Sequence, residues 1–303
     1  MAVPSRVTLV DVGPRDGLQN EKQAIDTADK VQLIAMLQAA GLREIEAASF
    51  VSPKWVPQMA DGADVMGRVA RGAGVRFHVL VPNMKGLEAA LLTRPDEVVV
   101  FAAVTEAFSQ KNINCSIAES IERFAPVVAQ ARAAGIRVRG ALSCTVGCPY
   151  QGEVTPDEVE RVVRLMKDIG VEHMGIADTI GVGTPRAVQA VMERALKHYA
   201  LADLSGHFHD TYGQALANIY ACLEMGIARF DASVAGLGGC PYAKGATGNV
   251  ASEDVVFMLD GLGIETGIDL DKLVDAGAFI SERLGRPPVS RVARALLAKR
   301  RGD

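Results

Sequence analysis

The chain has 303 residues, of which 49% are apolar, 22% charged and 5% aromatic, and its formal net charge is −4. This composition excludes a disordered or collagen-like chain. The mild acidity argues against a protein that binds nucleic acid or an anionic membrane surface, because no basic field attracts phosphates.

No apolar run approaches the ~20 residues that a membrane-spanning helix needs. The first residues contain no apolar signal core, so we expect a cytoplasmic protein. The five cysteines are irregularly spaced, which favours reduced thiols over a disulfide framework.

Short runs rich in Val, Ile, Ala and Phe alternate along the chain with longer helical patterns. The runs lack a clean polar alternation, which is typical of parallel strands that are covered on both faces. Helical patterns lie between several of the apolar runs, and most of the helical patterns are followed by a glycine that can end a helix. The predicted strands are 7–12, 44–50, 77–81, 98–104, 138–144, 173–178, 204–210 and 230–234, and the predicted helices are 27–40, 116–134, 155–169, 184–198 and 214–225.

A series of eight β-then-α units predicts an α/β fold, the (β/α)₈ or TIM barrel. The alternative is an open, doubly wound sheet. Such a sheet usually has a glycine-rich phosphate turn after its first strand, whereas residues 13–17 here read Gly-Pro-Arg-Asp-Gly. We expect a single catalytic domain over 1–303, with the barrel at about 5–264. Two extra helices, 269–284 and 290–300, are expected in the remaining C-terminal segment, about 265–303.

Catalytic groups of such a barrel lie at the C-terminal ends of its strands. His207 and His209 are two residues apart on one predicted strand, so their side chains point to the same face and could chelate one ion. The alternative is that both rings only form hydrogen bonds in the barrel mouth. Other polar residues at these strand ends are Arg15, Asp16, Glu46 and Asp178.

Two oxygen ligands could complete such a metal site. Asp16 follows the first strand, which pairs with the eighth strand in a closed barrel, and Asn249 lies in the loop after the eighth strand. Two nitrogens and two oxygens suit an octahedral divalent ion. By ligand type alone, the two imidazoles favour Mn²⁺, Co²⁺ or Zn²⁺ over Mg²⁺.

The loop at 236–249 holds five glycines in fourteen residues. It is either a flexible surface loop or a lid that closes over the catalytic face. Cys240 in this loop is the one cysteine placed to reach a substrate. Arg15 is either a structural ion-pair residue or a fixed cation for a developing oxyanion.

The chain resembles the 3-hydroxy-3-methylglutaryl-CoA lyases, in their bacterial form, over nearly its whole length. The segment 234–249 is the most specific match, because the related Claisen synthases share the Arg-Asp-Gly turn, the His-x-His strand and the final Asn but generally lack its Gly-Gly-Cys-Pro-Tyr stretch. The matching segments are VGPRDGLQNEK (12–22), SFVSPKWVPQM (49–59), KNINC (111–115), DTIGVGTP (178–185), HFHDTYGQALAN (207–218) and VAGLGGCPYAKGATGN (234–249).

The resemblance implies a metal-dependent retro-Claisen cleavage of 3-hydroxy-3-methylglutaryl-CoA to acetyl-CoA and acetoacetate, as in leucine degradation. The implied cofactor is Mg²⁺ or Mn²⁺, the implied partner an acyl-CoA thioester substrate, and the implied assembly a homodimer. The same chemistry on a longer branched 3-hydroxyacyl-CoA is an alternative, and a Claisen-type synthase or a non-catalytic metal-binding barrel is a more distant one.

The resemblance also implies a role for each candidate residue. Asp16, His207, His209 and Asn249 match the metal ligands of these lyases. Arg15 matches the arginine that binds the substrate carbonyl and steadies the enolate, and Cys240 matches the active-site cysteine. Glu46 and Asp178 match catalytic acidic residues that support the metal and the substrate.

Overall fold

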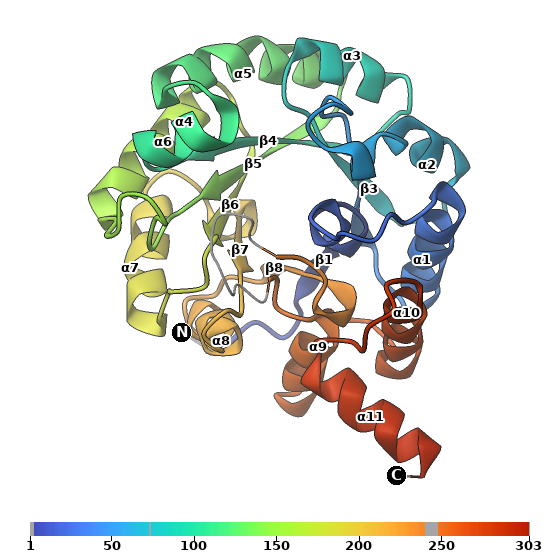
Figure 1. Ribbon diagram of the computed structural model, residues 1–303. Coiled ribbons are helices and arrows are strands. Elements are labelled where there is room, and N and C mark those ends of the chain that lie inside the picture. Colours follow the sequence, from blue (N-terminus) through green and yellow to red (C-terminus); the bar gives the residue numbers. More distant parts are fainter. Residues whose placement is uncertain (1–2, 73, 240–247, 303) are drawn as a thin grey trace.

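The eight predicted strands form a closed parallel barrel in the computed structural model, which describes residues 3–72, 74–239 and 248–302 (Figure 1). Each strand pairs with the next, and β1 closes the barrel by pairing with β8. The predicted (β/α)₈ class is confirmed. The strands are β1 (Thr8–Asp11), β2 (Glu44–Ser49), β3 (Arg76–Leu80), β4 (Glu97–Ala103), β5 (Arg137–Ser143), β6 (His173–Asp178), β7 (Leu204–Phe208) and β8 (Arg229–Ala232).

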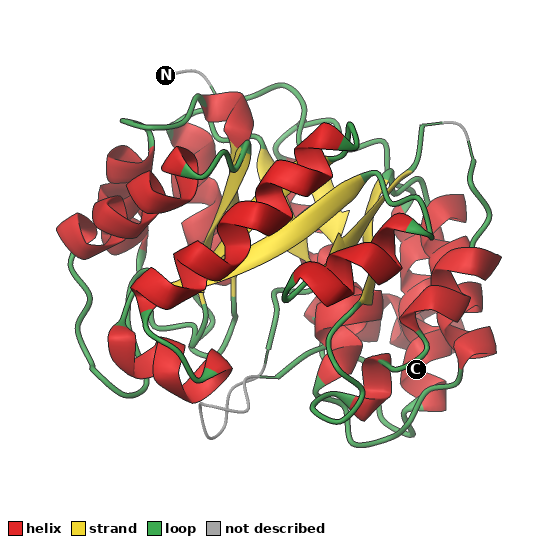
Figure 2. Ribbon diagram, turned by 90° about the horizontal axis from the view of Figure 1, so that it is seen from above, coloured by secondary structure: helices red, strands yellow, loops and turns green. Residues whose placement is uncertain are grey.

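Helices surround the barrel on its outer side (Figures 1 and 2). They are α1 (Thr27–Ala39), α2 (Gly62–Arg68), α3 (Met84–Leu91), α4 (Glu106–Ile113), α5 (Ile117–Ala133), α6 (Pro156–Asp168), α7 (Pro185–Ala195), α8 (Ala215–Glu224), α9 (Ser252–Gly261), α10 (Leu270–Arg283) and α11 (Arg291–Arg301). None of the helices in these described ranges is both long and apolar enough to span a membrane.

The predicted helices are all present, including the two C-terminal ones, α10 and α11. The sequence pattern did not single out α2, α3, α4 and α9. The first three have only seven or eight residues, which is too short to show a helical period, and α9 follows the glycine-rich loop directly.

Local signals in the sequence fix several helix ends. Thr155 and Glu158 form a capping box at the start of α6, in which each side chain bonds to the backbone N–H of the other residue. Gly170 follows α6 with a φ of 94°, a left-handed conformation in which any other residue would be strained. The four residues 169–172 are therefore enough to connect α6 to β6.

The apolar core lies mainly between the strands and the helices, whereas the barrel interior is charged. Arg229 on β8 lies 3.4 Å from a carboxylate oxygen of Glu44 on β2 and 3.6 Å from one of Glu97 on β4. His78 on β3 contacts both carboxylates, at 2.6 and 3.3 Å. Contacts between strands that are not neighbours run across the interior, so this cluster forms the barrel floor.

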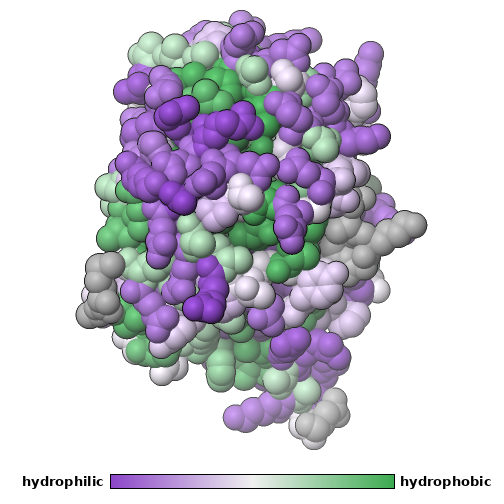
Figure 3. Space-filling view, turned by 90° about the vertical axis from the view of Figure 1, so that its left-hand side faces the viewer, coloured by the Kyte–Doolittle hydropathy of each residue, from purple (hydrophilic) through white to green (hydrophobic). Residues whose placement is uncertain are grey.

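The expectation that the strands lack a polar alternation was therefore wrong for several of them. Charged residues stand two apart and share the inward face on β2, β5 and β8, where the pairs are Glu44 with Glu46, Arg137 with Arg139, and Arg229 with Asp231. The outer surface mixes polar and apolar residues, as the face in Figure 3 shows, with hydrophilic side chains between smaller hydrophobic areas.

We predict that Glu97→Ala destabilises the protein by about 3–5 kcal/mol, because it leaves Arg229 buried without one of its two carboxylates. Denaturant unfolding of the purified protein measures this change. Glu122→Ala is the control, since Glu122 is exposed on α5 and its loss should change the unfolding free energy by less than about 0.5 kcal/mol. Equal stability of the two variants would contradict an energetic role for the floor cluster.

Candidate active site

A cavity of about 1010 Å³ opens at the C-terminal ends of the strands. Its wall on the side of β1, β2 and β7 carries the predicted polar residues Arg15, Asp16, Glu46, His207 and His209. Its wall on the side of β3, β4 and β5 is mainly apolar, with Leu80, Val99, Phe101 and Ala141, although Arg139 and Ser143 of β5 also line the cavity. The cavity therefore joins a charged half to an apolar half.

Asp16, His207 and His209 converge in the charged half. Each offers a ligand atom, and these atoms lie within 4.8 Å of one another. β7 ends at Phe208, one residue before His209 and two before the predicted end at 210. His209 still faces the same way as His207, because an isolated antiparallel bridge to Asn249 continues the extended backbone.

Asp16 is held from two sides. It lies in a short π-helical turn, Gly13–Gly17, directly after β1. Arg15 Nη1 lies 2.9 Å from its Oδ1, and Asn249 Nδ2 donates to its Oδ2 at 2.8 Å. Burial alone would raise the pKa of Asp16, but Arg15 and the two imidazoles outweigh it and hold the pKa below its ordinary value. The carboxylate is thus ionised at neutral pH.

The two histidines differ in their environments. Burial, followed by the repulsion of His207, lowers the pKa of His209 to about 4, so this ring is neutral at pH 7. Burial also acts to lower the pKa of His207, but the hydrogen bond to Asp231 and the negative charges of Asp231 and Asp16 together outweigh it and raise the pKa. A cation at His207 would therefore compete with a proton.

Arg15 is buried between two carboxylates. Its Nε donates to Glu46 Oε1 at 2.8 Å, and Nη2 lies 2.7 Å from the same oxygen. Burial raises the pKa of Glu46 despite the attraction of Arg15. Because both carboxylates fix the guanidinium at the cavity wall, Arg15 can meet negative charge on a bound molecule without rearranging.

Asp178 lies behind the site at the end of β6. Its carboxylate accepts hydrogen bonds from the backbone N–H groups of Val182 and Gly183, at 3.1 and 2.8 Å, and it does not line the large cavity. Burial raises the pKa of Asp178 to about 6. The structure thus places this carboxylate where it orders the β6–α7 loop.

Cys240 lies outside the described residues, together with 241–247. The described residues on either side adjoin the site. Gly239 lines the cavity and accepts a hydrogen bond from Asn20 at 3.1 Å, and Asn249 contacts Asp16.

Two buried aspartates at the site were missed from the sequence. Asp231 on β8 contacts His207, and Asp11 at the end of β1 accepts hydrogen bonds from Gly13 N, Val234 N and Ser252 Oγ, at 2.9, 3.0 and 2.7 Å. Asp11 thereby joins the turn that holds Asp16 to the loop after β8. The spacing of charged residues two apart on β8 was the signal for Asp231, whereas a single acid at a strand end gave no signal for Asp11.

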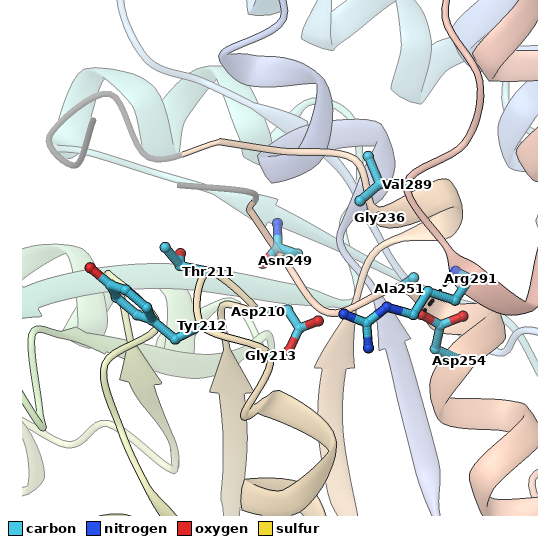
Figure 4. A pocket seen from close by; sticks show the side chains of 10 residues that line it. All are labelled: Asp210, Thr211, Tyr212, Gly213, Gly236, Asn249, Ala251, Asp254, Val289 and Arg291. Carbon is cyan, nitrogen blue, oxygen red and sulfur yellow. Dashed lines mark hydrogen bonds between the residues drawn. The ribbon is translucent and has the colours of Figure 1, made fainter. Parts of the chain in front are cut away.

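A second cavity, of about 370 Å³, lies beside Asn249 (Figure 4). Its wall includes Asp210 and Tyr212 from the loop after β7 and Arg291 from the start of α11. The side chain of Asn249 therefore stands between this cavity and the ligand cluster.

Comparison with known proteins agrees with this geometry. The chain is 58% identical over 299 residues to the 3-hydroxy-3-isohexenylglutaryl-CoA/hydroxymethylglutaryl-CoA lyase of Pseudomonas aeruginosa, an alignment that covers 99% of this chain and 100% of that protein. The crystal structure of hydroxymethylglutaryl-CoA lyase from Pseudomonas aeruginosa superposes with a TM-score of 0.96 at 58% identity, covering 99% of this chain and 100% of that chain.

A more distant structure is similar as well. The HMG-CoA lyase from Acinetobacter baumannii, in complex with coenzyme A and 3-methylmalate, has a TM-score of 0.93 at 34% identity and covers 97% of this chain and 96% of that chain. The sequence model of the family described as HMGL-like matches residues 6–280. The chain belongs to the HMGL-like family.

Proposed function

We propose that this protein is a hydroxymethylglutaryl-CoA lyase, which cleaves 3-hydroxy-3-methylglutaryl-CoA into acetyl-CoA and acetoacetate. The observation that carries the proposal is the convergence of three ligand atoms from Asp16, His207 and His209 within 4.8 Å, beside Arg15, in a chain 58% identical to such a lyase. A relative that binds coenzyme A supports an acyl-CoA thioester as the substrate.

Lyases of this family depend on a divalent metal, and the residues present fit one. Asp16 offers an ionised oxygen, and the amide nitrogen of Asn249 is engaged, which leaves its carbonyl oxygen to face a cation. His209 Nδ1 is buried and has no hydrogen-bond partner among the described residues. We propose that Asp16, His207, His209 and Asn249 hold Mg²⁺ or Mn²⁺, the ions that the family resemblance favours. Such an ion lowers the pKa of a hydroxyl that it contacts.

The residues of this chain then account for each proton and charge. Asp16 or a ligand histidine accepts the proton of the C3 hydroxyl, and the sequence and geometry support either base. The C2–C3 bond breaks, acetoacetate leaves, and the electron pair moves onto the thioester as an enolate. Arg15 donates hydrogen bonds to the enolate oxygen, which stabilises it by roughly 3 kcal/mol, the scale of one oxyanion donor.

Cys240 is proposed to complete the reaction by protonating C2. A thiol with an ordinary pKa of about 8.5 is protonated at neutral pH, so it can donate without any special shift. Glu46 holds Arg15 in place at 2.8 Å, and Asp178 orders the loop behind the ligands. We propose these supporting roles for both carboxylates.

A longer, branched 3-hydroxyacyl-CoA is a second candidate substrate. The cavity wall carries the apolar side chains Leu80, Val99, Phe101 and Ala141, which offer a longer branched chain a surface to pack against. The Pseudomonas relative is named for an isohexenyl substrate as well as the methyl one. Burial of each additional methylene favours binding by about 0.8 kcal/mol.

The remaining proposals rest on the family resemblance or on the sequence pattern alone. They are a homodimeric assembly, a place in leucine degradation, a cytoplasmic location, and a single catalytic domain that spans the whole chain.

We predict that metal-stripped protein cleaves no 3-hydroxy-3-methylglutaryl-CoA and that Mg²⁺ or Mn²⁺ restores acetoacetate release. His209→Ala should lower kcat/KM at least a hundredfold and weaken Mn²⁺ binding, because it removes a ligand. His198→Ala is the matched control, since His198 lies beside Glu160 on another part of the barrel and should keep both properties. Full turnover in the presence of excess chelator would overturn the proposed metal dependence.

Cys240→Ala should lower kcat at least tenfold while Mn²⁺ affinity stays unchanged, because the thiol is proposed to move a proton rather than to bind the ion. Steady-state kinetics and a metal titration measure the two properties. Cys222→Ala, which removes a buried thiol of α8 that does not line the cavity, should retain kcat. Wild-type kcat in the Cys240 variant would exclude this cysteine as the acid.

Ala141→Leu should separate the two candidate substrates, because the larger side chain fills the apolar half of the cavity. We expect kcat/KM for a 3-hydroxy-3-alkylglutaryl-CoA with a branched chain of six carbons to fall at least tenfold. The value for the 3-methyl substrate should change less than threefold. If the wild-type protein does not cleave the longer thioester, the second candidate is wrong and the first is untouched.

A further inference from the structure

Asp231 is a buried acidic residue that contacts His207, one of the proposed metal ligands. Its Oδ2 lies 3.0 Å from His207 Nδ1, and the two residues are register partners on neighbouring strands, β8 and β7. Asp231 is 6% exposed, so water competes little for this hydrogen bond. The register places one residue directly beside the other, which makes the contact a property of the barrel and not of a loop.

Arg139 fixes Asp231 in turn. Its Nη2 lies 2.7 Å from both carboxylate oxygens and also donates to Ser205 Oγ at 2.9 Å. Arg139 comes from β5 and is 2% exposed, so its side chain crosses the barrel interior to reach β8. Gly175 leaves room for it, because a Cβ at that position would lie 3.0 Å from Arg139 Nη2.

The chemistry of these contacts determines how His207 faces the ligand cluster. Arg139 donates to both oxygens of the Asp231 carboxylate, so this ion-paired group accepts hydrogen bonds and has none to give. Nδ1 of His207 must therefore carry the hydrogen, and the lone pair of Nε2 is left for a ligand bond. His209 differs from His207, because its buried Nδ1 has no hydrogen bond to a carboxylate among the residues the structure describes and is free to serve as a ligand atom itself.

We propose that Asp231 is a positioning residue that fixes the tautomer and orientation of His207, that Arg139 fixes Asp231, and that this pair sets the affinity of the site for a divalent metal. The inference rests on the proposed metal site. It assigns the two imidazoles different roles. The ring of His207 is held in the ligating orientation before the ion binds, whereas the ring of His209 becomes fixed when the ion binds.

The test is the affinity of metal-stripped protein for Mn²⁺, measured from the paramagnetic resonance signal of the free ion, together with kcat and KM at saturating Mn²⁺. Asp231→Asn should weaken Mn²⁺ binding tenfold to a hundredfold, the usual effect of losing such an outer contact. Saturating Mn²⁺ should restore most of kcat, and KM for the thioester should change less than threefold.

Glu97→Gln is the matched control for a merely structural effect. Glu97 is another buried acid of the barrel interior, paired with Arg229 and not with a metal ligand. It should lower thermal stability as Asp231→Asn does while leaving Mn²⁺ affinity unchanged. Should Asp231→Asn not fold, Asp231→Glu keeps the carboxylate but displaces it, and we expect it to weaken binding at least threefold.

Two outcomes overturn the inference. Wild-type Mn²⁺ affinity in a folded Asp231 variant would show that the contact does not tune the site. An equal loss of affinity in Glu97→Gln would show that any damage to the interior has the same effect. If the wild-type protein itself binds no Mn²⁺ and has no lyase activity, the proposed function fails first, and this result is distinct from the other two.

Discussion

The pairing of β1 with β8 is the constraint on which the active site depends. Asp16 follows β1, whereas His207 and His209 come from β7 and Asn249 follows β8. In an open sheet with the same order of strands, β1 and β8 would lie at opposite edges, and Asp16 would not meet the other three side chains. Four register pairs from Thr8–Arg229 to Asp11–Ala232 close the barrel, and Asp11 ties the turn after β1 to the loop after β8.

The charged barrel interior costs desolvation free energy, and packing of the barrel does not require charged residues there. An apolar interior of the same volume would be at least as stable, because desolvation of buried ions usually cancels their attraction. The charged residues across the interior are paired, from the Glu44–Arg229 contact at the floor to the Arg15–Glu46 contact at the cavity wall. The arrangement is understandable if the barrel must hold an oriented imidazole and a fixed guanidinium above that floor.

Whether the sequence predicted a feature depended on how far apart along the chain its residues lie. The strands were predicted from short apolar runs and the His207–His209 pair from its two-residue spacing, both of which are local properties of the sequence. Asp16 was added to the pair through the expected closure of the barrel. The Arg139–Asp231 contact joins residues 92 apart across the interior, and no local pattern reveals it. Cys240 remains a prediction, since it lies outside the described residues.

The balance of charge at the site links these contacts to the reaction. The guanidinium groups of Arg15 and Arg139 face the carboxylates of Asp16, Glu46 and Asp231, so one negative charge is left over when both histidines are neutral. That excess attracts a divalent cation, and once the cation is bound the same set carries one positive charge. A negatively charged enolate would then form in positively charged surroundings that stabilise it, within a buried site where screening by water is weak. The carboxylates that hold the side chains in place thus also attract the cation that makes the field positive.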